Sequence, residues 1–146
     1  MLQELNIKNA ALIKSTNIEF NKGLNVLSGE TGAGKSMVIG SLMFALGSRV
    51  SRDFIRAGEE KAAVEAVFTK LPIAAKNYAE NAGIDCSDGV FIFSRTINRD
   101  GRTTARVNGT SVTASVLKEL SLKLVDIHSQ HEHHSLLNPA RHIDIL

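Results

Sequence analysis

The sequence predicts a single α/β domain, and three observations lead to this prediction. The chain has 146 residues, of which 43% are hydrophobic and 22% are charged. This length and balance are typical of one globular domain with its own core. Segments with the two-residue period of strands alternate with segments that have the spacing of helices. A glycine-rich loop at residues 28–34 separates an apolar strand from a helix, an order that is common in α/β proteins.

The first third of the chain predicts two paired strands, followed by a strand, a loop and a helix. Residues 2–7 and 12–20 read as two strands around a short turn, and the second alternates apolar and polar side chains as a half-buried strand does. Residues 24–27 form a continuous apolar run, which is typical of a buried strand. The helix over residues 35–46 is apolar on nearly every side, so we expect it to be buried. Gly47 is suited to its C-cap.

The rest of the chain predicts a meander of strands between helices. Asp100-Gly101 and Asn108-Gly109 are dipeptides that favour tight turns, so three antiparallel strands are expected around them. Thr113 is suited to cap the helix that follows. The expected elements are a polar loop with a helical turn at 48–61, a strand at 63–68, a helix at 73–82, the meander at 90–112, a helix at 113–120, a strand at 122–127 and a last helix from Pro139 onward.

The last predicted helix stops at Leu146 with its apolar pattern unfinished, so we expect the chain to be a piece of a longer protein. The N-terminal residues lack the pattern of a secretion signal. The longest mostly apolar run, residues 37–47, is shorter than the about 20 residues that span a bilayer. The single cysteine, Cys86, excludes an internal disulfide and suits a reducing compartment. We therefore expect a cytoplasmic protein with no membrane partner.

A phosphate-binding motif is the strongest functional signal in the sequence. The pattern G-x-x-x-x-G-K-[ST] is met where an apolar strand leads into a helix, as its mechanism requires. Its glycines let backbone N–H groups point at phosphate oxygens, and the helix N-terminus adds about half a positive charge. Lys35 is expected to reach the β- and γ-phosphates, and Ser36 to bind Mg²⁺. The plainer alternative is a glycine-rich turn before a buried helix. The expected nucleotide-binding residues are Gly29, Glu30, Thr31, Gly32, Ala33, Gly34, Lys35 and Ser36.

The motif specifies nucleotide binding, whereas hydrolysis also needs a carboxylate on a second strand. The best internal candidate is Asp126, at the end of an apolar segment, but Ile127 and His128 follow it instead of a second acid. The N-K-x-D pattern that selects guanine is absent, so a GTPase is not favoured. The residues leave open a self-contained phosphate-loop kinase, with Asp126 as its acid and the arginines of residues 95–106 as its lid.

Positive charge is concentrated on one predicted hairpin. Residues 95–106 carry a net charge of +3, whereas the rest of the chain carries −1. Such a patch suits contact with a DNA backbone. Arginines on a solvated hairpin can equally pair with neighbouring acids or discourage edge pairing. The candidate DNA contacts are Arg95, Arg99, Arg102 and Arg106.

All five histidines lie between His128 and His142. Their spacing matches no standard zinc pattern and no cysteine lies nearby, so roles in a polar loop are favoured over a metal site. Cys86 has no visible base partner and is read as structural.

Segments in order along essentially the whole chain resemble the RecN family of bacterial DNA repair proteins. The most distinctive segment, residues 124–133, is similar to the family's segment around the Q-loop glutamine, here Gln130. Ser129 departs from the family pattern, in which glycine is expected, but leaves Gln130 in place. The other matching segments are residues 23–36, residues 55–58, the strand that ends in Phe68, residues 95–102 and residues 107–109.

The resemblance implies an α/β fold with a mixed sheet, the N-terminal lobe of an ABC- and SMC-type phosphate-loop ATPase head with an antiparallel β subdomain. In this family an N-terminal and a C-terminal half-head, separated by a coiled coil, fold together, and two heads sandwich ATP. Residues 1–146 are then the N-terminal half-head, without the signature motif and the Walker B acid. Lys35 and Gln130 are implied as catalytic residues, Ser36 and Gln130 as Mg²⁺ contacts, and Asp126 as structural.

The resemblance also implies the biological setting. The family acts in double-strand-break repair and recombination, binding DNA and linking DNA ends, in the cytoplasm at the nucleoid. The implied partners are ATP, Mg²⁺, DNA, the C-terminal half-head and a second head. The isolated chain is expected to bind ATP but to hydrolyse little, because the opposing signature motif is needed to stabilise charge on the γ-phosphate. The alternatives are the self-contained kinase, and a DNA-binding module whose nucleotide serves only structure.

Overall fold

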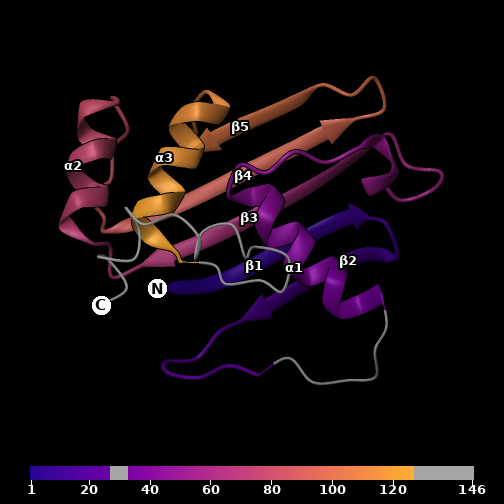
Figure 1. Cartoon of the computed structure of the whole chain (residues 1–146), viewed down its shortest axis with the longest axis horizontal. Helices are drawn as coiled ribbons and strands as arrows, with labels where there is room; N and C mark the ends of the chain where they lie inside the picture. Colours follow the sequence, from indigo (N-terminus) through magenta and orange to yellow (C-terminus); the bar gives the residue numbers. More distant parts are fainter. Residues whose placement is uncertain (27–32, 127–146) are drawn as a thin grey trace, which may run out of the picture.

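A computed structural model of the chain describes residues 1–26 and 33–126, which form one sheet with helices packed against it. The strands lie in the spatial order β2-β1-β3-β4-β5-β6, and every neighbouring pair is antiparallel (Figure 1). The strands are β1 (Leu2–Ala10), β2 (Ile13–Glu19), β3 (Lys61–Thr69), β4 (Val90–Asn98), β5 (Thr103–Val107) and β6 (Thr110–Ser111). The helices are α1 (Ala33–Ala45), the 3₁₀ turn η1 (Arg52–Phe54), α2 (Ile73–Asn81) and α3 (Ala114–Leu124).

The core lies on one face of the sheet, because alternation along the central strands sends every second side chain to that face. Val64 and Phe68 of β3 are buried there, and so are Phe91 and Phe93 of β4. The Phe93 ring centroid lies 5.3 Å from that of Phe68 and 6.0 Å from that of Phe91. Tilted aromatic pairs at such distances add about 0.5–1.5 kcal/mol beyond the area that they bury.

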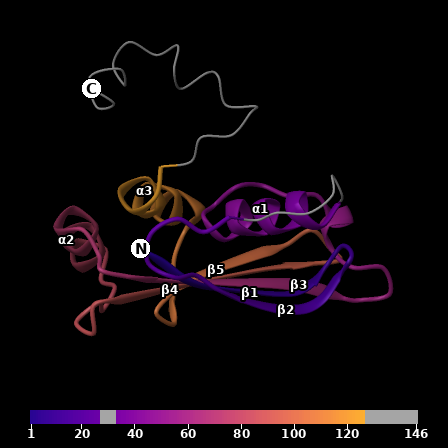
Figure 2. The same cartoon turned by 90° about the horizontal axis from the view of Figure 1, so that it is seen from below.

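The helices cover this same face, and the other face of the described sheet is left without a helix (Figure 2). α1 contacts β1, β3 and β4, and α2 packs against α3. The opposite face is polar: the Asn17 amide donates to Glu4 and Asn6 across β1 and β2, and the Thr96 and Thr104 hydroxyls are hydrogen-bonded across β4 and β5. An antiparallel sheet with one buried face and one solvent-exposed face accounts for the alternation of apolar and polar residues in the sequence. No helix within the two described ranges is long and apolar enough to cross a membrane.

The helix α1 ends as the sequence predicts but is buried less evenly. Gly47 has a φ of +111°, and the Gly47 and Ser48 N–H groups donate to the carbonyls of Phe44 and Met43 at 3.1 and 3.0 Å. This is the left-handed C-cap that glycine favours. Phe44 is fully buried, whereas the Ile39 side chain is 45% exposed. The prediction of a buried helix therefore holds for its C-terminal half only.

The strand predicted at residues 24–27 is not found in the described part of this segment. Residues 24–26 are not in a strand, and Leu24 and Val26 are 89% and 72% exposed. Leu27 lies outside the described residues. A strand needs a neighbour to satisfy its backbone hydrogen bonds, and no described strand pairs with residues 24–26. The predictions for β3, α2 and the β4–β6 meander are confirmed to within two residues.

The strand predicted at residues 122–127 is also wrong where it is described, because α3 continues to Leu124. The helix begins after Thr113, whose side-chain oxygen accepts the Val116 N–H at 3.2 Å. It buries Leu117 and Leu120, and Leu124 continues the same helical spacing. A short apolar run such as residues 122–125 fits a helix and a strand equally well by periodicity, and here the helix is the outcome.

Candidate nucleotide-binding site

The site begins at the N-terminal end of α1, where the second half of the phosphate motif forms the first turn. Ala33, Gly34, Lys35 and Ser36 are the first four residues of this 13-residue helix. Gly29, Glu30, Thr31 and Gly32, like Gln130, lie outside the described residues. The first four N–H groups of a helix have no partner within the helix. A helix N-terminus in this place can therefore donate hydrogen bonds to an anion.

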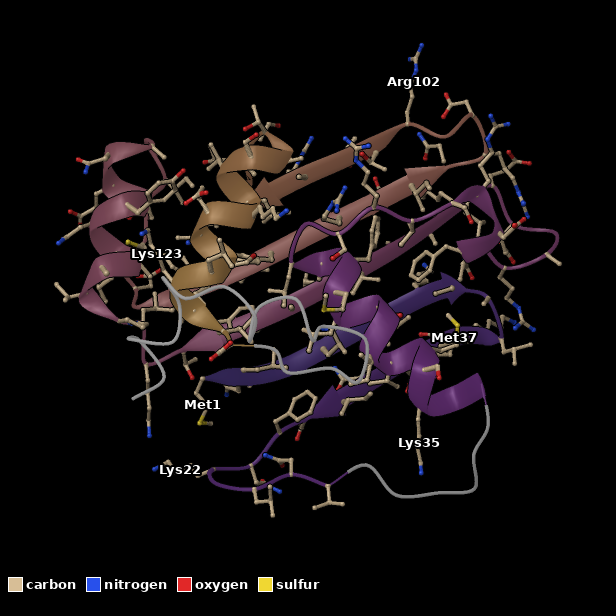
Figure 3. All side chains as sticks on the ribbon, in the orientation of Figure 1. Met1, Lys22, Lys35, Met37, Arg102 and Lys123 are labelled. Atoms are coloured by element: carbon tan, nitrogen blue, oxygen red, sulfur yellow. The ribbon has the colours of Figure 1, made fainter. Side chains whose placement is uncertain are left out.

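The side chains at this end fit a phosphate group. Gly34 and Ser36 are exposed, and the half-buried Lys35 extends outward from the first turn (Figure 3). The first turn contains no acidic residue that would repel an anion. A Cβ placed on Gly34 would meet nothing within 4 Å, so the space beside the backbone is open. The polar groups of this turn, an ammonium, a hydroxyl and the backbone N–H groups of a helix N-terminus, are of the types that bind phosphate and Mg²⁺.

The opposite end of α1 is held by Arg95 of β4. Its Nη1 donates to the carbonyl oxygens of Phe44 and Ser48, each at 2.9 Å, and its guanidinium carbon lies 4.4 Å from the centroid of the Phe44 ring. The Arg95 side chain is buried, and this burial lowers its pKa. The prediction that Arg95 contacts DNA is corrected here, because a buried guanidinium that caps a helix does not reach a phosphate backbone. The signal was present in the sequence: Arg95 alternates with Phe93 and Ile97 on the apolar face of its strand.

The other three hairpin arginines are exposed but lie in different places. Arg99 donates from Nε to the Glu59 carbonyl at 2.7 Å and from Nη2 to the Arg56 carbonyl at 2.9 Å. Arg102 projects from the β4–β5 turn (Figure 3), with its Nε 3.6 Å from Asp100. The third, Arg106, pairs in register with Ser94 and so belongs to the polar face of the sheet.

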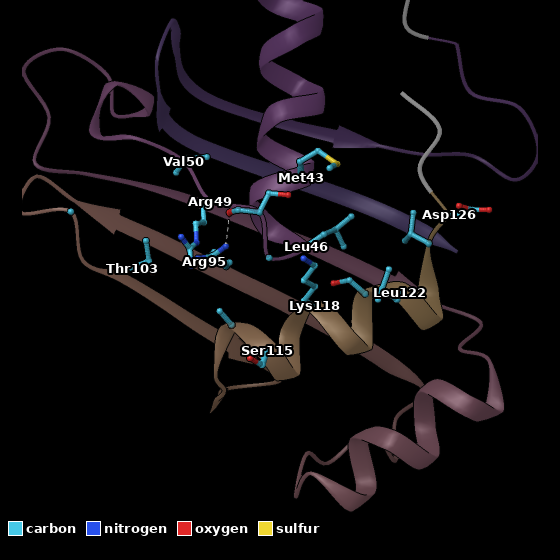
Figure 4. A pocket seen from close by; sticks show the side chains of 16 residues that line it. Met43, Leu46, Arg49, Val50, Arg95, Thr103, Ser115, Lys118, Leu122 and Asp126 are labelled. Carbon is cyan, nitrogen blue, oxygen red and sulfur yellow. Dashed lines mark hydrogen bonds between the residues drawn. The ribbon is translucent and has the colours of Figure 1, made fainter. Parts of the chain in front are cut away.

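A pocket of about 930 Å³ lies between α1 and α3, beside the C-terminal end of α1. Figure 4 shows Arg95 beside Arg49, with Lys118 and Leu122 of α3 on the other wall. Asp126 also lines this pocket. It follows a helix and not a strand, so the placement that suggested a kinase acid is absent.

The remaining candidates from the sequence are Cys86 and a metal site. Cys86 is buried, and burial is the main cause that raises the pKa of its thiol. Its Sγ lies 3.9 Å from the Lys76 carbonyl oxygen, which fits the structural role that the sequence predicted. No group of three metal-ligating side chains occurs within residues 1–26 and 33–126. The histidines between His128 and His142 lie outside these ranges.

Comparison with known proteins identifies the class to which this fold belongs. The AAA domain family model matches residues 4–141, so the chain belongs to the AAA domain family. It superimposes on a chain from a structural study of ATP-driven dimerization and DNA-stimulated activation of SMC ATPases, with a TM-score of 0.68, 22% identity, and coverage of 99% of this chain and 96% of that one. It also matches the SMC head domain from Thermotoga maritima, with a TM-score of 0.63, 22% identity, and coverage of 81% and 41%. The fold is therefore that of an SMC-type ATPase head, as predicted. The mixed sheet that was also predicted is not found among the described strands, which are all paired antiparallel.

Comparison of sequences points to a more specific group of relatives than comparison of folds does. The chain is 44% identical over 149 residues to the DNA repair protein RecN of Halalkalibacterium halodurans, and the match covers all of this chain and 26% of that protein. The resemblance to the N-terminal part of RecN is therefore confirmed. The chain spans about a quarter of the length of the curated relatives that it matches.

Proposed function

We propose that the chain is the ATP-binding N-terminal half-head of a RecN-like ATPase that acts in DNA double-strand-break repair and recombination. One observation carries the proposal: Lys35 and Ser36 lie in the first turn of α1, with Gly34 before them and no acid among them. The donors at this end of the helix are local, so phosphate binding here does not require the rest of a RecN-like protein.

The chain's own residues have separate roles in this proposal. The backbone N–H groups of residues 29–36 bind the β- and γ-phosphates, and Lys35 adds a mobile cation there. Ser36 and Gln130 would hold Mg²⁺ through oxygen atoms, and Gln130 would orient the attacking water, because its amide has both a donor and an acceptor. ATP is the substrate, and a bound Mg²⁺ would supply charge neutralisation at its phosphates.

Hydrolysis needs groups beyond those of the phosphate loop. We infer that the Walker B acid and the signature motif come from a C-terminal half-head and from a second head. The RecN proteins are about four times as long as this chain, which leaves room for both. The self-contained kinase is not favoured, because Asp126 follows α3 and lines the pocket at the far end of α1.

DNA is the proposed macromolecular partner. The matched relative is a DNA repair protein by name, and the exposed Arg99, Arg102 and Arg106 are the residues of this chain that we assign to the phosphate backbone. The proposed location is the cytoplasm, at the nucleoid. The DNA-binding module with a merely structural nucleotide remains the alternative that nucleotide-independent DNA binding would favour.

The proposal is tested by titrating Mg²⁺-ATP into the chain and measuring the affinity by calorimetry. Lys35→Ala is expected to weaken binding about tenfold or more, because a charge-assisted hydrogen bond contributes about 1.5–3 kcal/mol. Lys61→Ala is the matched control, since Lys61 is an exposed lysine at the start of β3. Equal affinities for Lys35→Ala and the unmutated chain would refute the assignment of the phosphate site.

A second experiment tests the division of the active site. ATPase turnover is measured for the chain alone and after addition of a separately made C-terminal half-head. We expect turnover only in the mixture. Full turnover by the chain alone would show that its site is complete, and Asp126→Asn would then test the kinase reading.

A further inference from the structure

We propose that Arg95 is a positioning residue for the nucleotide site: it fixes the buried end of α1 and thereby sets where Lys35 and Ser36 stand. This inference rests on the proposed function of the phosphate loop, and it assigns to that site a residue from a distant strand.

The Arg95 guanidinium is buried in an unusual setting. The side chain is 4% exposed, and its Nε has no hydrogen-bond partner among the described residues. Within residues 1–26 and 33–126 no carboxylate lies within ion-pair distance of it. Its charge is instead met by the Phe44 and Ser48 carbonyls at 2.9 Å and by the face of the Phe44 ring. The Phe44 carbonyl belongs to the last turn of α1, where the helix dipole is negative and a cation is stabilising, and the Ser48 carbonyl lies just after the C-cap of the helix.

The C-terminal end of α1 is its most buried part. Ser41, Phe44, Ala45 and Leu46 are buried, whereas Gly34, Ser36 and Ile39 in the first half are exposed. The Phe44 ring also packs against Phe54 of η1, with the ring centroids 5.1 Å apart. Met37 and Val38 of the first half also pack against the core, but they are only partly buried. The fully buried residues of the helix are therefore concentrated near the end that Arg95 binds, and the phosphate-binding turn lies beyond them.

The length of α1 determines how far a tilt at its C-terminal end displaces the phosphate-binding turn. Lys35 and Phe44 are nine residues apart, so the rise of an α-helix separates them by about 14 Å. A tilt of about 5° at the anchored end moves the first turn by about 1 Å. Misplacement of about 1 Å at a site of this kind can cost a hundredfold in function. Two hydrogen bonds from one nitrogen to two carbonyls, together with a ring contact, resist such a tilt better than apolar packing alone.

The test compares Arg95→Met and Arg95→Lys with the unmutated chain. Methionine keeps much of the side-chain length but removes the donors, and lysine keeps the charge but loses the planar guanidinium. We expect Arg95→Met to weaken Mg²⁺-ATP binding about tenfold and Arg95→Lys about threefold, measured well below the unfolding midpoint of each variant. Lys61→Met is the matched control, because it makes the same type of change on an exposed strand residue and is expected to leave the affinity unchanged.

Hydrogen exchange separates positioning from general destabilisation. We expect faster exchange in Arg95→Met at the backbone amides of α1, with the amides of β1 and β3 unchanged. An ATP affinity equal to that of the unmutated chain in Arg95→Met would overturn the inference, and so would faster exchange across the whole sheet. If Arg95→Met does not fold, Arg95→Lys decides alone: an unchanged affinity overturns the inference and a weakened one, with the sheet amides unchanged, supports it.

The two proposals fail in different ways. If Lys35→Ala leaves ATP binding unchanged, the proposed function is wrong. If Lys35→Ala weakens binding while Arg95→Met does not, the phosphate site stands and only the role of Arg95 is refuted.

Discussion

Phe93→Ala tests the one-sided core on which the whole arrangement depends. Phe93 is fully buried in β4, between Ala66 of β3 and Val107 of β5 in the sheet register. Truncation of a buried phenylalanine costs about 3–5 kcal/mol in the free energy of unfolding. Loss of the ring contacts with Phe68 and Phe91 places Phe93 in the upper part of that range. A domain is stable by only about 5–15 kcal/mol, so the loss is a large fraction of the total.

The assay is urea unfolding followed by circular dichroism, with Ile92→Ala as the matched control. Ile92 directly precedes Phe93 on the same strand, but it lies on the opposite face of the sheet and is 37% exposed. We expect Ile92→Ala to cost about 1 kcal/mol, because the side chain is only partly removed from water. In thermal unfolding, Phe93→Ala is expected to lower Tm by roughly 10 °C. If the two substitutions cost the same, the assignment of the faces of the sheet would be refuted.

Three further predictions concern a helix cap, a thiol and the arginines. Thr113→Ala is expected to lower the free energy of unfolding by about 1 kcal/mol, since it removes the acceptor for the Val116 N–H; an unchanged urea midpoint would contradict this cap. Because burial raises the pKa of the Cys86 thiol, we expect it to ionise at a higher pH than a free cysteine does. Its labelling at a pH of about 8.5 should therefore be slower than that of free cysteine, and it should become fast in urea. Charge removal in Arg102→Gln or Arg106→Gln is expected to weaken DNA binding and to reduce the slope of log affinity against log salt by about one for each lost contact; a slope that stays the same in both variants would exclude these arginines from the DNA interface.

Elements with strong local signals were predictable from the sequence. The β4–β5 turn follows from Asp100-Gly101, and Gly101 has a φ of +86°. The cap at Thr113 and the ending of α1 near Gly47 follow from residue types that satisfy helix ends locally. The fold class and the relationship to RecN were also available from the sequence, because the phosphate motif and the neighbouring segments are distinctive as strings of residues.

Elements that depend on distant partners were not predictable in the same way. Residues 24–26 have the composition of a buried strand, yet backbone pairing decides whether a strand forms, and no described strand pairs with them. Residues 122–124 have an apolar pattern that fits two structures, and they continue α3 after the turns that Thr113 and Leu117 begin. For residues 24–26 the deciding contacts are those with a distant strand, and for residues 122–124 they are those with the preceding turns of the same helix. A short window of sequence contains neither.

The arginines of residues 95–106 show the same division within one segment. The sequence by itself determined the phosphate motif, the positions of the turns and the concentration of positive charge. Alternation with Phe93 and Ile97 placed Arg95 on the apolar face of its strand, but only the tertiary structure decided that the end of α1 covers it while Arg102 and Arg106 face solvent. Charge is a property of each residue, whereas burial depends on which element packs over a strand. Here that element is the end of α1 with the segment after it, whose Phe44 and Ser48 carbonyls lie 51 and 47 residues before Arg95 in the chain.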